Sequence, residues 1–169
     1  VDPLPGASKN TKYTLVFDEA VDGFSSFYSA VPPLYIENND ILLSVDPTDQ
    51  LSVYKHHSGE WGNFYGTVEE SSITMILNSD ADANKILRTI EFNSIVRDDD
   101  KIIDRTKTIT SFKVETEYQT TGRVEFSTGR IKRKWDKWRL KIPRDQNNGT
   151  DRLRSTHFIL TLYFDNTEN

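Results

Sequence analysis

The run Phe158-Ile159-Leu160-Thr161-Leu162-Tyr163-Phe164 decides the fold, because it is the most apolar stretch of the chain. It is rich in aromatic and branched aliphatic side chains and holds no charge. A short run of this kind is typical of a strand that is covered on both faces. We therefore predict that residues 158–164 form a central strand of a sheet.

Further short strand signals, separated by turns, continue outward from this run. The clearest is a hairpin, in which Leu34–Ile36 and Ile41–Val45 flank the turn-forming residues Glu37–Asp40. The only helix-like stretch, Asp80–Lys85, begins with a candidate Asp cap and is too short for more than one or two turns. Strand character also marks residues 13–17, 51–55, 71–78, 86–96, 108–118 and 135–142. We predict an all-β fold, an antiparallel β-sandwich of the jelly-roll or Ig-like type, with at most one short helix near residues 80–86.

Length and composition indicate one folded domain. The chain has 169 residues, of which 36% are hydrophobic and 11% aromatic, so it can bury a core and is not disordered. Residues 1–12, rich in Pro, Gly, Ser and Lys, predict a flexible leader, and residues 13–169 predict a single β-sandwich domain. Because the sequence begins with Val1 and not Met, we interpret it as a fragment of a longer protein.

No pattern of catalytic or metal-binding residues stands out. The absence of cysteine excludes disulfides, thiol nucleophiles and thiolate zinc sites. His56 and His57 are adjacent and would point to opposite faces of a strand, and His157 lies far off in sequence. The run Asp98–Asp100 lacks the ligand spacing of a calcium loop. Phosphate-loop, nucleophile-elbow and dinucleotide motifs are also absent, so we predict no enzyme, no catalytic residue, no cofactor and no metal ligand.

Charge is distributed unevenly along the chain. Residues 16–104 hold 17 acidic and 5 basic residues, whereas residues 123–154 hold 11 basic and 4 acidic residues. One interpretation is a polar surface that docks onto an acidic neighbour, such as the acidic patch of an identical subunit. The alternative is that these charges lie on strand faces that meet water.

The basic segment Arg130–Arg139 interleaves cations with Trp135 and Trp138, a pattern that also suits nucleic acid. The two indoles are three residues apart, so on a regular strand they face opposite sides, one toward a core and the other covered by arginine. The net charge of −5 at pH 7 opposes a dedicated nucleic-acid binder. We therefore predict no nucleic-acid partner.

Several segments recur together, in this order, in one known family. They are Phe24–Pro32, Leu51–His57, Gly62–Thr67, Asn84–Asn93, Lys134–Asp145 and Asp151–Arg154. Over residues 13–165 the chain resembles the C-terminal part of large virion structural proteins of crAss-like phages of Bacteroidetes, of the kind that builds the tail muzzle. The resemblance implies a bacteriophage tail component that acts by multimeric assembly and has no enzymatic activity.

The same resemblance implies that the partners are other copies of the protein and other tail proteins. The sequence has no apolar run near 18 residues, so we predict no membrane insertion. The place would be the virion tail, after assembly in the bacterial host cytoplasm. Since aromatic residues and arginine are the usual anchors of interfaces, the interface candidates are Trp61, Phe64, Tyr65, Trp138, Arg139 and Arg144. The alternative is core packing for the aromatic residues and a surface ion pair for the two arginines.

Two other hypotheses remain open. The chain can be a carbohydrate- or receptor-binding β-sandwich module at the tail tip, whose aromatic faces stack on a host surface glycan. A depolymerase domain is the third hypothesis, and it requires a pair of carboxylates in a cleft.

Overall fold

Strands and connecting turns make up the fold, and the computed structural model describes residues 12–97, 102–126 and 130–165. Across these ranges there is no helix, and every strand pairing is antiparallel, which confirms the predicted all-β fold. The strands are β1 (Thr14–Asp18), β2 (Gly23–Tyr28), β3 (Tyr35–Asn38), β4 (Ile41–Val45), β5 (Val53–Lys55), β6 (Asn63–Phe64), β7 (Thr67–Val68), β8 (Ser71–Leu77), β9 (Lys85–Ile86), β10 (Thr89–Phe92), β11 (Val96–Arg97), β12 (Ile103–Asp104), β13 (Ser111–Glu115), β14 (Val124–Glu125), β15 (Ile131–Lys134), β16 (Lys137–Lys141), β17 (Arg154–Ser155) and β18 (Phe158–Phe164).

The segment considered for a short helix, residues 80–86, is a turn followed by a strand. Residues 81–83 form the turn, and β9 then pairs with β17, so that Ile86 lies opposite Arg154. Pairing with a distant strand therefore gives this segment the backbone hydrogen bonds that a short helix would otherwise need.

The chain divides into two compact units, Val1–Thr67 (unit 1) and Val68–Asn169 (unit 2), and each is described by itself. The predicted leader, residues 1–12, lies outside the described residues except for Lys12. The single domain predicted over residues 13–169 stays a prediction.

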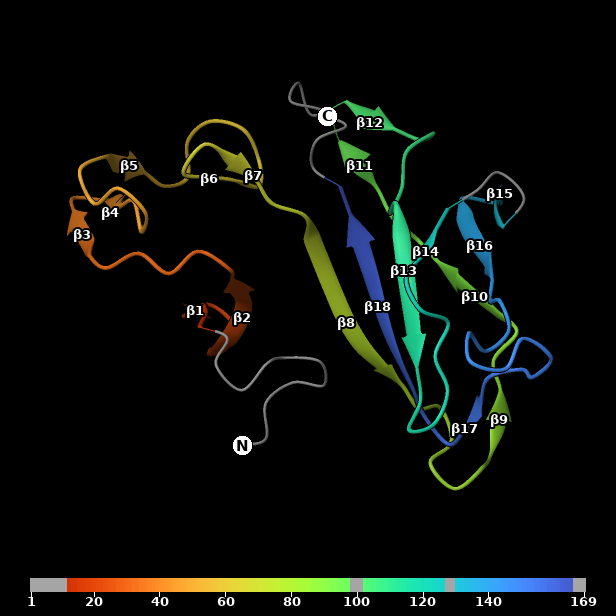
Figure 1. Cartoon of the computed structure of the whole chain (residues 1–169). Coiled ribbons are helices and arrows are strands. Elements are labelled where there is room, and N and C mark those ends of the chain that lie inside the picture. The colour runs from red at the N-terminus through yellow and green to blue at the C-terminus, as the bar shows by residue number, and fades with distance from the viewer. Residues whose placement is uncertain (1–11, 98–101, 127–129, 166–169) are drawn as a thin grey trace. The chain divides into compact units, whose positions relative to one another are not determined.

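Unit 2 contains the two main sheets, seen in Figure 1 as two layers. One has the strand order β14-β13-β18-β8 and the other has the order β10-β16-β15. As predicted, β18 is central, because Leu160 pairs with Val114 of β13 on one side and with Met75 of β8 on the other. Side chains from both sheets join one buried cluster, as in a β-sandwich.

The core of unit 2 follows from the two-residue period of its strands. β16 buries Trp138 and Leu140 and exposes the cations on either side of them. β18 likewise turns alternate side chains inward, and each large apolar side chain so buried contributes roughly 1.5–3 kcal/mol. The buried cluster consists of Phe112, Val114, Leu140, Ile142, Leu153, Phe158, Leu160 and Leu162.

Unit 1 contains the sheets β1-β2 and β3-β4-β5. The predicted hairpin is confirmed, since Asn38 pairs with Ile41 across a two-residue turn in which Asn39 and Asp40 have φ of 44° and 66°. These angles fit the type I′ turn, which matches the twist of the paired strands and favours Asn and Asp.

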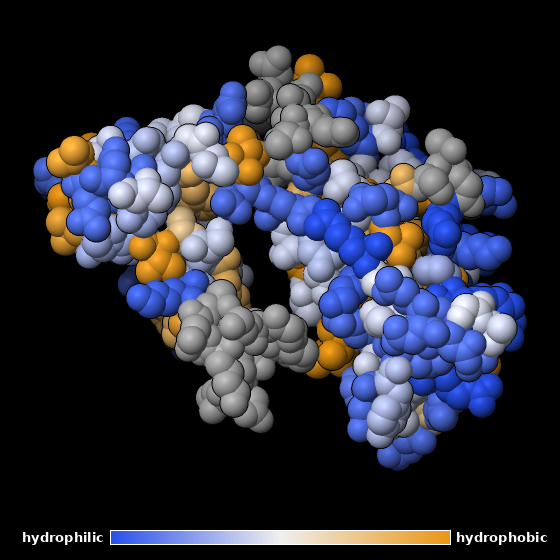
Figure 2. Space-filling model, viewed as in Figure 1, coloured by the Kyte–Doolittle hydropathy of each residue, from blue (hydrophilic) through white to orange (hydrophobic). Residues whose placement is uncertain are grey.

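Unit 1 differs from unit 2 in what it buries. Among the described residues, the buried hydrophobic side chains all lie in unit 2, whereas unit 1 buries Pro32, Ser44 and Asp46. On the face shown in Figure 2, hydrophobic residues, coloured orange, reach the surface over unit 1. The apolar side chains of unit 1 are therefore largely left at its surface.

Candidate interaction surfaces

One face of the β1–β2 hairpin carries five large apolar side chains, Tyr13, Leu15, Phe17, Phe24 and Phe27, which we call the hairpin face. Leu15 pairs with Phe27, and Phe17 pairs with Phe24. The rings of Tyr13 and Phe27 meet edge to face at 5.3 Å, and those of Phe17 and Phe24 at 5.4 Å. All five side chains are 44–67% exposed. Since a two-stranded ribbon alone is marginally stable, a contiguous apolar face of this kind is a candidate interface.

Three of the predicted interface residues follow each other around β6. Trp61 lies in the turn before β6 and is 78% exposed. Phe64 and Tyr65 are half-buried, and they pack 5.1 Å from the ring of Tyr28 and 5.2 Å from the ring of Tyr54, respectively. The structure thus leaves the indole of Trp61 accessible and gives Phe64 and Tyr65 packing contacts of their own.

Tyr65 also belongs to a polar cluster inside unit 1. Ser44 Oγ lies 2.6 Å from His56 Nε2 and 2.6 Å from the hydroxyl of Tyr65. Burial lowers the pKa of His56 below its ordinary value of 6.5, with a smaller effect from the neighbouring His57, and burial raises the pKa of Tyr65. Ser44 is completely buried, and its hydroxyl joins β4 to His56 and Tyr65 inside unit 1.

The two tryptophans of the basic segment have opposite environments. Trp138 is 9% exposed, and the guanidinium of Arg133 lies 5.8 Å from the centre of its ring, which favours the core-packing alternative for this residue. Trp135 is 84% exposed and forms the turn between β15 and β16 with Asp136, at φ of 56° and 59°. A bulky residue rarely adopts such angles, and Trp-Asp is not a turn signal, so sequence reasoning missed this exposed tip.

The two predicted arginines make surface contacts. Arg139 points away from the core and forms an ion pair with Glu91 of β10 at 3.6 Å, in line with the alternative considered for it. Arg144 donates a hydrogen bond to the carbonyl of Thr150. Both side chains remain exposed, and their role as interface residues stays a prediction.

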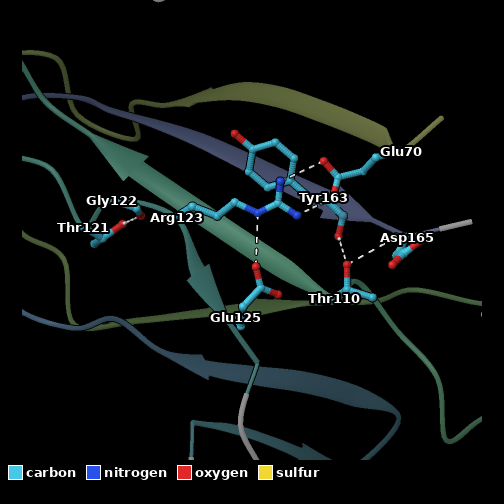
Figure 3. Close-up of polar contacts among 8 residues, drawn as sticks. All are labelled: Glu70, Thr110, Thr121, Gly122, Arg123, Glu125, Tyr163 and Asp165. Atoms are coloured by element: carbon cyan, nitrogen blue, oxygen red, sulfur yellow. Dashed lines mark hydrogen bonds and ion pairs between the residues drawn. The ribbon is translucent and has the colours of Figure 1, made fainter. Parts of the chain in front are cut away.

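A group of contacts centred on Arg123 was not expected from the sequence (Figure 3). Its guanidinium donates to both carboxylate oxygens of Glu70, one at 2.9 Å, and to Glu125 at 3.2 Å. It also lies 4.4 Å from the centre of the Tyr163 ring. The carboxylate of Glu70 is the main cause of the raised pKa of Arg123. These contacts connect Glu70, the residue before β8, with β14 and β18. Arg123 therefore stabilises the arrangement of these strands.

In the described part of the chain, no cluster of side chains could hold a metal ion and no helix could span a bilayer. Within residues 12–97, 102–126 and 130–165, no three His, Cys, Asp or Glu side chains gather in a way that could hold a metal ion. The run Asp98–Asp100, considered for calcium, lies outside the described residues. Over the same described ranges, no helix has the length and apolar character needed to cross a bilayer.

Comparison with known proteins adds to this geometry. Residues 59–145, just over half of the chain, match the family described as the crassvirus muzzle protein C-terminal domain. The muzzle protein of Bacteroides phage crAss001 is 29% identical over 156 residues, which cover 89% of this chain and 11% of that protein. The chain thus spans about a tenth of the length of this relative. These matches confirm the resemblance seen in the sequence, and the chain belongs to the crassvirus muzzle protein C-terminal domain family.

Proposed function

We propose that this chain is a structural component of a phage tail, which acts by assembling in multiple copies and catalyses no reaction. Membership of the muzzle family and the similarity to the crAss001 muzzle protein support a virion role. In this proposal the chain is assembled in the bacterial host cytoplasm, and its partners are other copies and other tail proteins. The observation that supports assembly is the exposure of the hairpin face in unit 1.

The hairpin face supplies the apolar part of a contact between copies. Burying one exposed large apolar side chain contributes roughly 1.5–3 kcal/mol, before the cost of association is subtracted. The five side chains of this face supply the apolar centre that interfaces need, and the charged residues of the adjoining turn supply a polar rim. Assembly would therefore give unit 1 the apolar core that it lacks.

Sedimentation velocity of the purified chain over a range of concentrations tests the proposal. We expect oligomers whose population rises with concentration. The double variant Phe17→Ser, Phe24→Ser should weaken association by at least roughly tenfold, because it removes two paired rings of the hairpin face. The matched control is Leu51→Ser, since Leu51 is 89% exposed and lies outside that face. A chain that stays monomeric at all concentrations, or equal effects of the two substitutions, would contradict the proposal.

The second candidate, a carbohydrate-binding module, is favoured by the accessible indole of Trp61. An exposed aromatic face can stack on a sugar ring, as it does on other planar or apolar groups. Titration with host surface glycans should then show saturable binding that Trp61→Ala abolishes. Trp135→Ala is the matched control, because Trp135 is equally exposed and lies in a different unit. If no glycan binds, or if both variants lose binding alike, this candidate is rejected.

A further inference from the structure

Six cations from segments far apart in sequence line one groove of unit 2. Two belong to β16, one belongs to β15 and another directly precedes it, and the remaining two lie just before β10 and near β17. The groove has a volume of about 470 Å³ and is lined by Thr89 and by Arg88, Arg130, Lys132, Arg139, Lys141 and Arg152. We call it the cationic groove.

The alternation of β16 explains why these side chains share one face. Trp138 and Leu140 turn inward, so Arg139 and Lys141 turn outward. The register then places Lys132 of β15 directly opposite Arg139. Like charges in directly opposed positions destabilise a sheet, and Glu91, opposite Arg139 on β10, offsets this pair only in part.

Little of this positive charge is neutralised by other described residues. In the described ranges, the only ion pair formed by the six cations joins Arg139 to Glu91 at 3.6 Å, and both side chains are more than half exposed. A concave surface lined by one sign of charge attracts partners of the opposite sign. Four of the six cations are arginines, whose planar guanidinium groups bind carboxylates through two parallel hydrogen bonds.

A matching anionic surface lies at the end of β1 and in the turn that leads to β2. Asp18, Glu19 and Asp22 fall within five residues, and all three side chains are exposed. Asp18 Oδ1 accepts a hydrogen bond from the backbone N–H of Ala20 at 2.9 Å, which helps to shape the turn. We call these three residues the acidic turn. It closes the same hairpin that carries the hairpin face, so carboxylates and apolar anchors lie on one element.

We propose that the acidic turn of one copy docks in the cationic groove of a second copy. This docking rests on the proposed assembly and specifies the polar contact between the copies. An identical chain is the occupant that the charges favour, because residues 16–104 carry the acidic excess and residues 123–154 carry the basic excess. Since the two surfaces differ, the contact is head to tail, and its repetition closes a ring or extends a filament.

Charge reversal on each surface tests this contact in the full chain. The groove variant carries Lys132→Glu and Arg139→Glu, and the turn variant carries Asp18→Lys and Glu19→Lys. Asp22 is left unchanged because its φ of 50° disfavours lysine. Each variant alone should associate at least roughly tenfold more weakly than the wild type. The groove variant places two carboxylates among the six cations and lowers their formal charge from +6 to +2, and the turn variant changes the formal charge of the acidic turn from −3 to +1. Lys137→Glu is the matched control, since Lys137 lies on β16 outside the groove, and it should leave association nearly unchanged.

Mixing the two variants gives the decisive result. In the mixture, the two lysines introduced in the turn variant face the two glutamates introduced in the groove variant, and native turns face native grooves, so an equimolar mixture should regain association to within about threefold of the wild type. Near-UV circular dichroism of each variant verifies its fold. If both variants are folded and the mixture stays dissociated, or if each variant alone assembles like the wild type, this contact is overturned. If each variant alone assembles like the wild type, the proposed assembly stands and only the docking of the acidic turn is overturned. A monomeric wild type overturns both the assembly and the docking.

A nucleic acid is the alternative occupant of a cationic groove, and the same variants distinguish it. A labelled single-stranded oligonucleotide would bind the wild type and the turn variant but not the groove variant, with a strong dependence on salt. Such binding, together with a mixture that does not regain association, would assign the groove to nucleic acid and overturn the docking of the acidic turn.

Discussion

Leu160→Ala is the substitution that tests the core of unit 2 most directly. Leu160 is 1% exposed at the centre of β18, between Val114 and Met75 on the neighbouring strands. It belongs to the run that predicted the central strand. A shortened side chain at this position leaves a hole between the two sheets, and the surrounding strands can close it only in part.

The expected cost follows from the atoms removed. Leu→Ala deletes three carbon atoms, which at about 0.8 kcal/mol for each buried methylene amounts to roughly 2.4 kcal/mol. A residual cavity of about 40 Å³ adds roughly 1 kcal/mol at about 24 cal/mol per Å³. We therefore expect Leu160→Ala to lower the free energy of unfolding by about 3.5 kcal/mol.

Urea denaturation followed by tryptophan fluorescence measures this loss, because Trp138 is buried in the same unit. The matched control is Thr161→Val. Thr161 is the next residue of β18, and its hydroxyl lies 3.0 Å from that of the exposed Thr74, so its loss should cost less than about 1 kcal/mol. A cost below about 1 kcal/mol for Leu160→Ala, or equal costs for the two variants, would refute the assignment of β18 to the centre of the core.

Three further predictions concern single positions. Gly122→Ala should lower stability by about 1–2 kcal/mol in urea denaturation, because Gly122 has φ of +60° and an added Cβ would lie 2.3 Å from Gln146 Oε1. His56 has a lowered pKa in the folded chain, so below pH 6.5 the unfolded chain binds more protons than the folded chain. The free energy of unfolding should therefore be full above pH 6.5 and fall as the pH drops below it. Thermal melts at a series of pH values should show this dependence, and His56→Gln should weaken it. Trp135→Asn should raise the free energy of unfolding by up to about 1 kcal/mol in urea denaturation, because Asn tolerates the φ of 56° better than Trp. A lower free energy of unfolding would show that contacts of the indole stabilise the fold.

The comparison of Trp135 with Trp138 shows how far sequence reasoning reaches. A spacing of three residues predicted opposite faces of one strand, and the two indoles do have opposite environments. The cause is different, because Trp135 lies in a turn and Trp138 in β16. Local preferences did not indicate a turn at Trp-Asp, since the pairing of β15 with β16 imposes it.

The segment 80–86 and the six interface candidates show the same limit. Asp and Ala at its start favoured a helical turn, yet pairing with β17 makes residues 85–86 a strand. Among the candidates, the sequence could not separate the exposed Trp61 from the buried Trp138, because burial depends on which strands stack above each residue.

The amino-acid sequence by itself determined the all-β class, the hairpin that turns within Glu37–Asp40, the central position of residues 158–164 and the family. These features depend on the residues of local turns, on the alternation of apolar and polar side chains along a strand and on the order of motifs, all of which can be read directly from the sequence. Only the tertiary structure brought Arg88, Arg130 and Arg152 to one groove, and only it left the aromatic residues of β1 and β2 uncovered. The reason is that a shared surface depends on strand register and on the stacking of sheets, which join residues distant in sequence.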